Sequence, residues 1–317
     1  MEKRPVAAVL YDFDKTLSPK DMQEYSVIPE LGMDPAAFWA EANRLAEENR
    51  MDGNLAWMYE MILQLKSRRK STKKEYFYEC GKKVELFKGV ESWFDRINAY
   101  GAERGLEIKH YIISSGLKEI IEGSSIAKHF DRIYASTFLY TADGVTEWPA
   151  QSVNYTNKTQ FIFRIAKGRF EEWDNSVNDP MDEDDLAVRY SNMIYIGDSA
   201  TDIPCMRLVK SRGGYSVGVY DGEKNLKKNV YELFDSGRIN FFAPADYSEG
   251  SELDGVVKKI VSRISAGEDL RRVSARNKAL AADYKKYSAA KRALEDQGGG
   301  ADAVLKKLKE KVKGDVE

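Results

Sequence analysis

Cysteine and histidine are scarce in this chain, which has two of each among 317 residues. Cys80 and Cys205 are far apart and belong to no closely spaced pair. A disulfide framework is therefore ruled out, and a cysteine-based zinc site is not expected. The other pair, His110 and His129, is too small for a histidine-rich zinc centre. These scarcities fit a protein of a reducing compartment.

Long apolar runs are absent as well, since no window approaches the roughly 18 residues that a membrane span needs. The apolar run Val6–Tyr11 is too short for a signal peptide and ends at Asp12. We therefore expect a cytoplasmic protein with no membrane partner. The 49 basic and 51 acidic residues leave a net charge of −2, which gives no reason to expect nucleic acid. The sequence does not indicate an oligomeric state.

Short apolar or β-branched runs recur along the chain and alternate with helical patterns. Such runs are typical of strands buried on both faces of a parallel sheet. The sequence therefore predicts an α/β fold, with a Rossmann-like, mainly parallel sheet flanked by helices. The predicted strands are Val6–Tyr11, His110–Ser114, Arg132–Ala135, Met193–Gly197, Ser216–Tyr220 and, more weakly, Ile239–Ala243.

A helical segment of nearly a hundred residues separates the first two predicted strands. We expect helices beginning at Pro35, over Leu55–Leu65 and over Ser71–Lys83, and a crossover helix over Gly89–Tyr100. Two further helices are predicted over Gly116–Ile126 and Thr159–Lys167. This pattern predicts a catalytic core from residues 1–20 and 88–266, and an inserted helical cap from residues 21–87.

Three other segments stand out by composition. Thr137–Trp148 is typical of a hairpin, in which Asp143 and Gly144 provide the turn. Residues 171–185 contain eight acidic side chains and no basic one, which favours a solvated loop. Residues 267–317 hold 13 basic and nine acidic residues, and Gly298–Gly300 divides them into two helical pieces. A solvated helix explains this tail better than a partner or nucleic-acid site does.

Paired aspartates follow two of the predicted strands. Asp12 and Asp14 come directly after Val6–Tyr11, and Asp198 and Asp202 come after Met193–Gly197. Ligands bind beyond the carboxyl ends of strands in such sheets, so the four carboxylates are expected to converge there. Hard oxygen ligands of this kind suit Mg²⁺. A turn or helix cap made by Asp and Thr is the structural alternative for the first pair.

Two other segments offer groups that complement a phosphate. Ser114, Ser115 and Gly116 end the second strand with a hydroxyl group and backbone N–H groups at a predicted helix start. Lys158 stands where the helix after the hairpin begins, and its charge could offset that of a carboxylate–phosphate site. A lone serine or an exposed lysine would carry little meaning without the aspartate pairs.

Taken together, these four segments resemble the motifs of the haloacid dehalogenase (HAD) superfamily of phosphohydrolases. The resemblance rests on DFDKT (Asp12–Thr16), IIS (Ile112–Ser114), Lys158 and GDSATD (Gly197–Asp202), in the family's order. It covers about residues 5–18 and 88–265. The helical insertion between the first two motifs is similar to the cap of phosphoserine-phosphatase-like members.

The resemblance implies a role for each matching residue. Asp12 would be the nucleophile and Asp14 the general acid and base. Ser114, Ser115 and Lys158 would bind the phosphoryl group. Asp12, Asp14 through its backbone carbonyl, and Asp198 would coordinate Mg²⁺, with Asp202 assisting directly or through water, and Thr16 would orient the loop. An acid at Asp14 argues for phosphate esters over halogenated acids, because dehalogenase members lack it.

Departures from the family pattern bear on the substrate. Ser115 stands where phosphoserine phosphatases usually have a second glycine, and the insertion has no convincing counterpart of their cap Glu/Arg pair. We therefore expect a small phosphorylated metabolite other than phosphoserine, with Tyr25, Trp39 and Trp57 as candidate cap contacts. The prediction is a Mg²⁺-dependent phosphatase that forms an aspartyl-phosphate. The alternatives are a phosphotransferase on the same site and a non-catalytic HAD-fold binding or regulatory protein.

Overall fold

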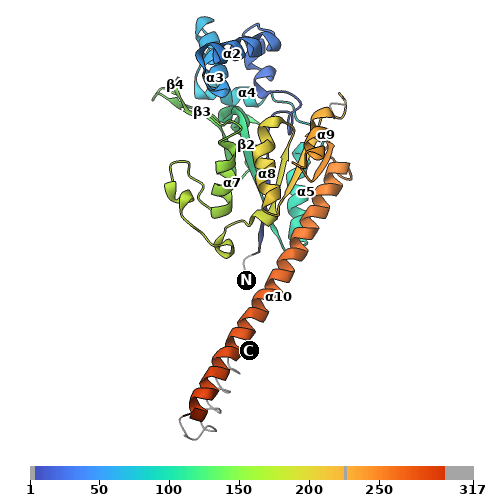
Figure 1. The fold of residues 1–317 in the computed structure, drawn as a ribbon. Coiled ribbons are helices and arrows are strands. Elements are labelled where there is room, and N and C mark those ends of the chain that lie inside the picture. Colours follow the sequence, from blue (N-terminus) through green and yellow to red (C-terminus); the bar gives the residue numbers. More distant parts are fainter. Residues whose placement is uncertain (1–3, 225–226, 297–317) are drawn as a thin grey trace. The chain divides into compact units, whose positions relative to one another are not determined.

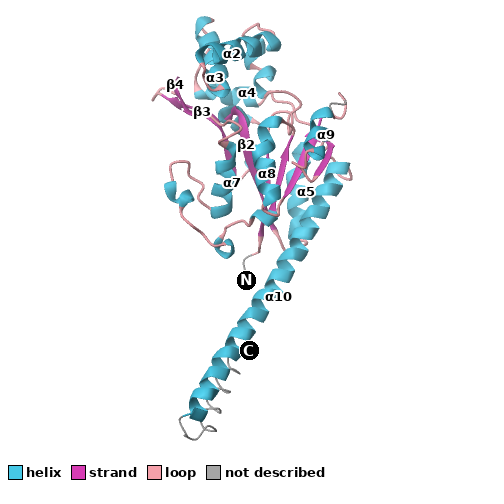
Figure 2. Ribbon diagram, in the orientation of Figure 1, coloured by secondary structure: helices cyan, strands magenta, loops and turns pink. Residues whose placement is uncertain are grey.

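One sheet of seven strands organises residues 4–224 and 227–296, the part of the chain that the computed structural model describes (Figure 2). The strand order is β4-β3-β2-β1-β5-β6-β7. Every neighbouring pair is parallel except β3 and β4. This arrangement confirms the predicted α/β class. The strands are β1 (Val6–Tyr11), β2 (Glu107–Leu117), β3 (Arg132–Tyr140), β4 (Thr146–Gln151), β5 (Met193–Gly197), β6 (Tyr215–Tyr220) and β7 (Phe241–Pro244).

The central strand β1 shows how the sheet divides the core into two layers. Its successive side chains point to opposite faces. Ala7, Val9 and Tyr11 belong to one buried apolar cluster, whereas Ala8 and Leu10 belong to another. The first cluster includes residues of helix α5 (Val90–Ala102), and the second includes residues of α7 (Lys158–Lys167) and α8 (Ile203–Ser211). Burial on both faces explains why the strand sequences are apolar throughout.

Short helices form the insertion between β1 and β2, where the sequence predicts them (Figure 1). Asp34 and Asp52 cap two of them, since each carboxylate accepts hydrogen bonds from backbone N–H groups of the first helical turn. The boundaries of a separate cap domain stay a prediction. The helices are η1 (Met22–Tyr25), α1 (Val27–Glu30), α2 (Pro35–Asn49), α3 (Gly53–Ser67) and α4 (Lys74–Gly81).

Two glycines allow α4 to pack closely on helix α6 (Lys118–Gly123), which follows β2. A Cβ atom at Gly81 would lie 2.1 Å from the Ile120 carbonyl oxygen. One at Gly123 would lie 1.9 Å from the Tyr78 carbonyl oxygen. Backbone atoms cannot yield as a flexible side chain does, so only glycine fits at either position. The last helix of the insertion is therefore fixed to the core at short range.

The end of β2 differs from the prediction. We expected a helix over Gly116–Ile126 that begins beside Ser114, but β2 continues to Leu117 and α6 has only six residues. The pairing of β2 with β3 shifts register between Ile113 and Leu117. With this irregularity, Ser115 and Gly116 remain in the strand, and the helix begins only at Lys118.

The predicted hairpin over Thr137–Trp148 is confirmed. Strands β3 and β4 pair in antiparallel register, and Gly144 has a φ of 77° in the turn between them. The weak strand signal near Ile239 is also confirmed, since β7 pairs in parallel with β6.

The acidic segment 171–185 is a loop with short 3-10 turns, η3 (Asn175–Asn178) and η4 (Glu183–Asp185), and it is attached to α7 through its backbone. The buried Arg164 donates hydrogen bonds to the carbonyl oxygens of Glu171 and Asp174. Lys167 donates to the carbonyl oxygen of Val177 at 2.7 Å. Two cations of one helix therefore hold a segment that has no basic residue of its own.

After β6 come helix α9 (Lys228–Asp235), β7 and helix α10 (Glu252–Asp296). The chain forms two units, Met1–Ser265 and Ala266–Glu317, and α10 passes from one to the other without a break. The predicted start of the tail at residue 267 stays a prediction. The division at Gly298–Gly300 lies outside the described residues. None of the helices in the described ranges is long and apolar enough to cross a membrane.

A directed chain of hydrogen bonds crosses the core beneath β1. The Trp93 indole N–H donates to the Tyr11 hydroxyl oxygen at 2.8 Å, and the Tyr11 hydroxyl lies 3.0 Å from His110 Nδ1. His110 Nε2 lies 3.0 Å from the Asn98 side-chain oxygen. A neutral His110 with its proton on Nε2 would accept a hydrogen bond from the Tyr11 hydroxyl at Nδ1 and donate one to Asn98. Burial lowers the pKa of His110 to about 3, and nearby His129 acts in the same direction.

We expect acid to destabilise the fold through His110. A histidine with a depressed pKa in the folded state contributes stability above its unfolded pKa of 6.5, and that contribution is lost as the pH falls. The free energy of unfolding should drop by about 2 kcal/mol between pH 6.5 and pH 5 from this group. Urea unfolding at several pH values would measure the drop.

The matched pair of variants for this experiment is His110→Gln and His129→Gln. His110→Gln should remove this contribution, so that the change in its free energy of unfolding between pH 6.5 and pH 5 differs from that of the unmodified chain by about 2 kcal/mol, whatever its own stability. His129→Gln should keep it, because His110 remains. An unchanged pH dependence in His110→Gln would contradict the assignment.

Candidate active site

Three neighbouring strands in the middle of the sheet bring the predicted site residues together. Asp12 follows β1, Asp198 follows β5, and Ser114 lies near the end of β2. The Asp12 N–H donates to the Ile196 carbonyl oxygen at 3.0 Å, which continues the pairing of β1 with β5. Because β1 lies between β2 and β5 in a parallel sheet, these residues gather at one edge, where such sheets bind ligands.

Lys158, the first residue of α7, is completely buried between two aspartates. Its Nζ lies 3.2 Å from Asp12 Oδ1 and 2.8 Å from Asp202 Oδ1. Burial opposes the positive charge, but the carboxylates of Asp12 and Asp202 outweigh it and raise the pKa of Lys158. The lysine therefore stays charged inside the protein.

Asp202 accepts several hydrogen bonds that hold it in place. The Tyr195 hydroxyl donates to Oδ1 at 2.8 Å, and the N–H and hydroxyl of Ser199 both donate to Oδ2 at 3.3 Å. A Cβ atom at Gly197 would lie 2.6 Å from Asp202 Oδ2. The Asp202 carboxylate therefore occupies the space that a side chain at position 197 would need.

Asp12, Asp198 and Asp202 form an acidic cluster whose ligand oxygens lie within 4.8 Å of one another. Burial, followed by the charge of Asp202, raises the pKa of Asp12 to about 6, against the opposite effect of Lys158. The same two causes raise the pKa of Asp198. Asp12 Oδ1 is buried and contacts Lys158 Nζ. Three close carboxylates with one buried lysine beside them leave a surplus of negative charge that fits a hard divalent cation such as Mg²⁺.

Asp14 occupies a different position from the acidic cluster. Its Oδ1 accepts a hydrogen bond from the Met22 N–H at 2.8 Å. Burial, with the charges of Asp21 and Asp12, holds the pKa of Asp14 well above its usual range. Lys15, the next residue, has a φ of 58°, which few non-glycine residues adopt and which marks the sharp turn after Asp14. Thr16 donates to Asp198 Oδ1 at 3.4 Å.

A cavity of about 290 Å³ opens over these residues. Asp12, Asp14, Asp198, Ser114 and Ser115 line it, whereas Lys158, Asp202 and Thr16 are completely buried and lie outside its wall. Ser114 Oγ accepts a hydrogen bond from the Gly116 N–H at 3.1 Å. The structure thus gathers every predicted site residue within one cavity or directly beneath it. The catalytic and binding roles of these residues stay predictions.

Residues of the insertion also line this cavity. Trp39 of α2 and Trp57 of α3 line it, as does Asn54. Tyr25, which we also expected there, is not part of the wall, and Ser18 donates to its hydroxyl at 3.1 Å. Gln23 lines the cavity as well, and neither Gln23 nor Asn54 stands in a motif that could have pointed to it. Tyr195, beneath the site, appeared in the sequence only as a buried strand residue.

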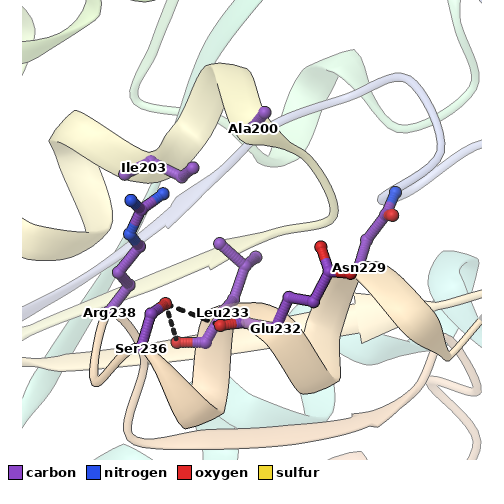
Figure 3. Close-up of a pocket in the computed structure, with 7 residues that line it drawn as sticks. All are labelled: Ala200, Ile203, Asn229, Glu232, Leu233, Ser236 and Arg238. Carbon is purple, nitrogen blue, oxygen red and sulfur yellow. Dashed lines mark hydrogen bonds between the residues drawn. The ribbon is translucent and has the colours of Figure 1, made fainter.

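A second hollow, of about 380 Å³, lies between α8 and α9 (Figure 3). Its wall includes Glu232 and Arg238, and the Ser236 hydroxyl donates to the Glu232 and Leu233 carbonyl oxygens. With one carboxylate and no convergent polar groups, it lacks the chemistry of the Asp12 cavity. We therefore place the candidate active site at Asp12.

The sequence of this chain is similar to those of known proteins. The family model of haloacid dehalogenase-like hydrolases matches residues 9–207, which include every predicted site residue. An uncharacterized protein of Borreliella burgdorferi is 28% identical over 290 residues, covering 82% of this chain and 98% of its own length.

Solved structures with a similar fold include phosphoserine phosphatases. A probable phosphoserine phosphatase from Vibrio cholerae matches with a TM-score of 0.51 and 14% identity, over 83% of this chain and 67% of its own. A phosphoserine phosphatase in apo form matches with a TM-score of 0.50 and 15% identity, over 80% of this chain and 98% of its own. At such low identity these matches show the fold alone. Because the family model spans well over half of the sequence, the chain belongs to the haloacid dehalogenase-like hydrolases.

Proposed function

We propose that the chain is a Mg²⁺-dependent phosphatase that hydrolyses a small phosphorylated metabolite through an aspartyl-phosphate on Asp12. The observation that carries the proposal is the contrast between two carboxyl groups in one cavity. Asp12 lies 3.2 Å from a buried lysine that favours its charged form. Asp14 accepts a hydrogen bond from a backbone N–H, and burial with the charges of Asp21 and Asp12 raises its pKa against the opposite effect of Lys15. One group suits a nucleophile and the other a proton donor.

The two groups would act in two steps. In the first, an Asp12 oxygen forms a bond to phosphorus while the bond to the alcohol oxygen breaks, and Asp14 gives that oxygen its proton. In the second, Asp14 takes a proton from water as the water oxygen bonds to phosphorus. The bond between Asp12 and phosphorus then breaks, which releases inorganic phosphate and restores both carboxyl groups.

Lys158 would hold the Asp12 carboxylate in position and offset the charge of the phosphoryl group above it. Ser114 and Ser115, on the wall of the same cavity, would offer hydrogen bonds to the phosphoryl oxygens. Asp202 already accepts hydrogen bonds on both oxygens, and its chief role would be to fix Lys158. Thr16, bonded to Asp198, would keep the loop oriented.

The acidic cluster would hold the metal ion through Asp12 and Asp198, with Asp202 assisting and the Asp14 carbonyl completing the protein ligands as the family resemblance implies. Mg²⁺ bound there would offset the repulsion between the Asp12 carboxylate and a phosphate dianion. The cavity is at the small end for ligand sites, which favours a small substrate. The helices of the insertion would act as a cap, because Trp39 and Trp57 face the site from it.

Replacing Asp12 with Asn should remove phosphate release almost completely, by about 10³-fold or more, because the amide is a poor nucleophile. The protein should stay folded, because Asp202 still pairs with Lys158, but its thermal midpoint should fall, because the buried lysine loses one of its two charged partners. Phosphate release from a generic aryl phosphate, with a melting curve beside it, would test both. Asp143→Asn, in the exposed hairpin turn, is the control and should keep full activity. Substantial turnover by Asp12→Asn would contradict the assignment.

Mg²⁺ should also stabilise the folded protein. A ligand that binds only the folded state adds about 2.7 kcal/mol at a hundred times its Kd. The thermal midpoint should therefore rise by several degrees with added Mg²⁺ and fall again with EDTA. Asp198→Asn should abolish the rise, while Asp143→Asn keeps it. A thermal midpoint insensitive to Mg²⁺ in the unmodified chain would argue against a metal site at the acidic cluster.

Tyr195→Phe tests whether Asp202 positions Lys158. It removes one hydrogen bond to Asp202 without touching the cavity, so kcat should fall about tenfold, the equivalent of about 1.4 kcal/mol. Tyr134→Phe is the matched control, because Tyr134 is also a buried strand tyrosine and its hydroxyl donates to the Phe170 carbonyl oxygen, away from the site. If both variants lost activity equally, Tyr195 would have only a structural role.

A further inference from the structure

The wall that the insertion contributes to the active-site cavity has an unusual composition. Trp39 and Trp57 stand nearly perpendicular, with ring centroids 6.5 Å apart and an interplanar angle of 72°. The Trp39 indole N–H donates to Glu24 Oε1 at 3.2 Å, and the Trp57 indole N–H donates to Asn54 Oδ1 at 3.3 Å. Both N–H groups are already satisfied within the protein. What the two indoles still offer a ligand is therefore aromatic surface.

The charge near these indoles is negative. Lys15 is the one lysine or arginine on the cavity wall among the described residues, and it is paired with Asp21 at 2.7 Å. Glu24, bonded to Trp39, forms no ion pair with a lysine or arginine of the described residues, although the charge of Lys15 acts on it and partly opposes the rise in its pKa that burial causes. On the described cavity wall, a substrate whose alcohol part carries a carboxylate would find only Lys15, which Asp21 already pairs. A positive group would be attracted by Glu24 and by the faces of the indoles.

Gln23 adds an independent observation. Its side chain is 1% exposed and lines the same cavity, yet its Oε1 accepts no hydrogen bond in the described part of the chain. A buried acceptor without a donor costs free energy. A ligand that brings an N–H donor or a positive charge to this end of the cavity would remove that cost.

We propose that the substrate of this site is the phosphomonoester of a small amino alcohol, with its alkylammonium group bound between Trp39, Trp57 and Gln23. The inference rests on the proposed phosphatase function and adds the chemistry of the leaving group. The phosphoryl group would lie at Asp12 and the ammonium group at the wall that the insertion contributes. A primary ammonium would donate to Gln23 Oε1, and a quaternary ammonium would pack on the indoles. Ethanolamine phosphate carries the primary ammonium group, and choline phosphate carries the quaternary one.

The first experiment compares kcat/KM for matched esters in the presence of Mg²⁺. Phosphoserine is ethanolamine phosphate with one added carboxylate, and 3,3-dimethylbutyl phosphate is a neutral isostere of choline phosphate. The better of the two ammonium esters should exceed phosphoserine by about a hundredfold, because the carboxylate is unpaired. Choline phosphate should exceed its neutral isostere by about tenfold. The proposal would be overturned if kcat/KM for phosphoserine were as high as for both ammonium esters. It would also be overturned if kcat/KM for 3,3-dimethylbutyl phosphate equalled that for choline phosphate.

An aryl phosphate in the same panel separates the two hypotheses. Hydrolysis of the aryl ester with no preference for ammonium esters would refute the substrate class and leave the phosphatase standing. If no ester is hydrolysed, the phosphatase proposal fails. Binding of the same esters then tests whether the cavity holds an ammonium group. Calorimetry with Asp12→Asn and Mg²⁺ should show tighter binding of choline phosphate or ethanolamine phosphate than of phosphoserine. Equal or weaker binding of both would overturn the site.

Glu24→Gln tests whether the charge of Glu24 causes the preference for ammonium esters, because glutamine has nearly the same shape as glutamate. The ratio of kcat/KM between choline phosphate and 3,3-dimethylbutyl phosphate should fall several-fold towards one, because a negative charge beside the indoles is lost. Glu79→Gln is the control, since Glu79 lies on α4 in an exposed pair with Lys82 and should keep the ratio. A ratio that Glu24→Gln leaves unchanged would remove Glu24 from the recognition of the cation.

Discussion

The buried ion pairs of Lys158 are the interaction on which the active site depends. A charged lysine with no exposed surface is tolerated only because Asp12 and Asp202 lie within 3.2 Å of it. Removing a partner from such a pair typically costs about 3–5 kcal/mol. The lysine comes from α7, Asp12 from the end of β1, and Asp202 from the turn before α8. One ammonium group thus ties three separate parts of the sheet's edge into a single site.

The lysine does not neutralise all the acid that surrounds it. Burial and mutual repulsion raise the pKa values of Asp12, Asp14 and Asp198, so the site without a cation is under electrostatic stress. Such stress is typical of functional sites, where it serves binding instead of folding. A divalent ion and a phosphoryl group would relieve it together, because each offsets the charge of the other. Further acidic side chains stand at the start of the insertion, where Asp21 pairs with Lys15 and Glu24 accepts a hydrogen bond from Trp39.

Much of this arrangement could be predicted from the sequence, because strand periodicity and the two aspartate pairs depend on local spacing. Asp12 and Asp198 were placed together simply by following adjacent parallel strands to their ends. The extension of β2 to Leu117 could not be predicted, since it follows from a register shift against β3. Nor could the bond from Tyr195 to Asp202, or the position of Gln23 in the cavity. Those contacts depend on how segments distant in sequence pack together.

The acidic loop illustrates a different relation between sequence and shape. Arg164 and Lys167 hold it through the carbonyl oxygens of residues such as Glu171, Asp174 and Val177. Every amino acid has a carbonyl group, so these bonds do not depend on which side chains the loop carries. Mutation can therefore change the loop's charge and composition during evolution while its path is preserved. Selection on its shape would act on the two basic residues of α7, outside the loop itself.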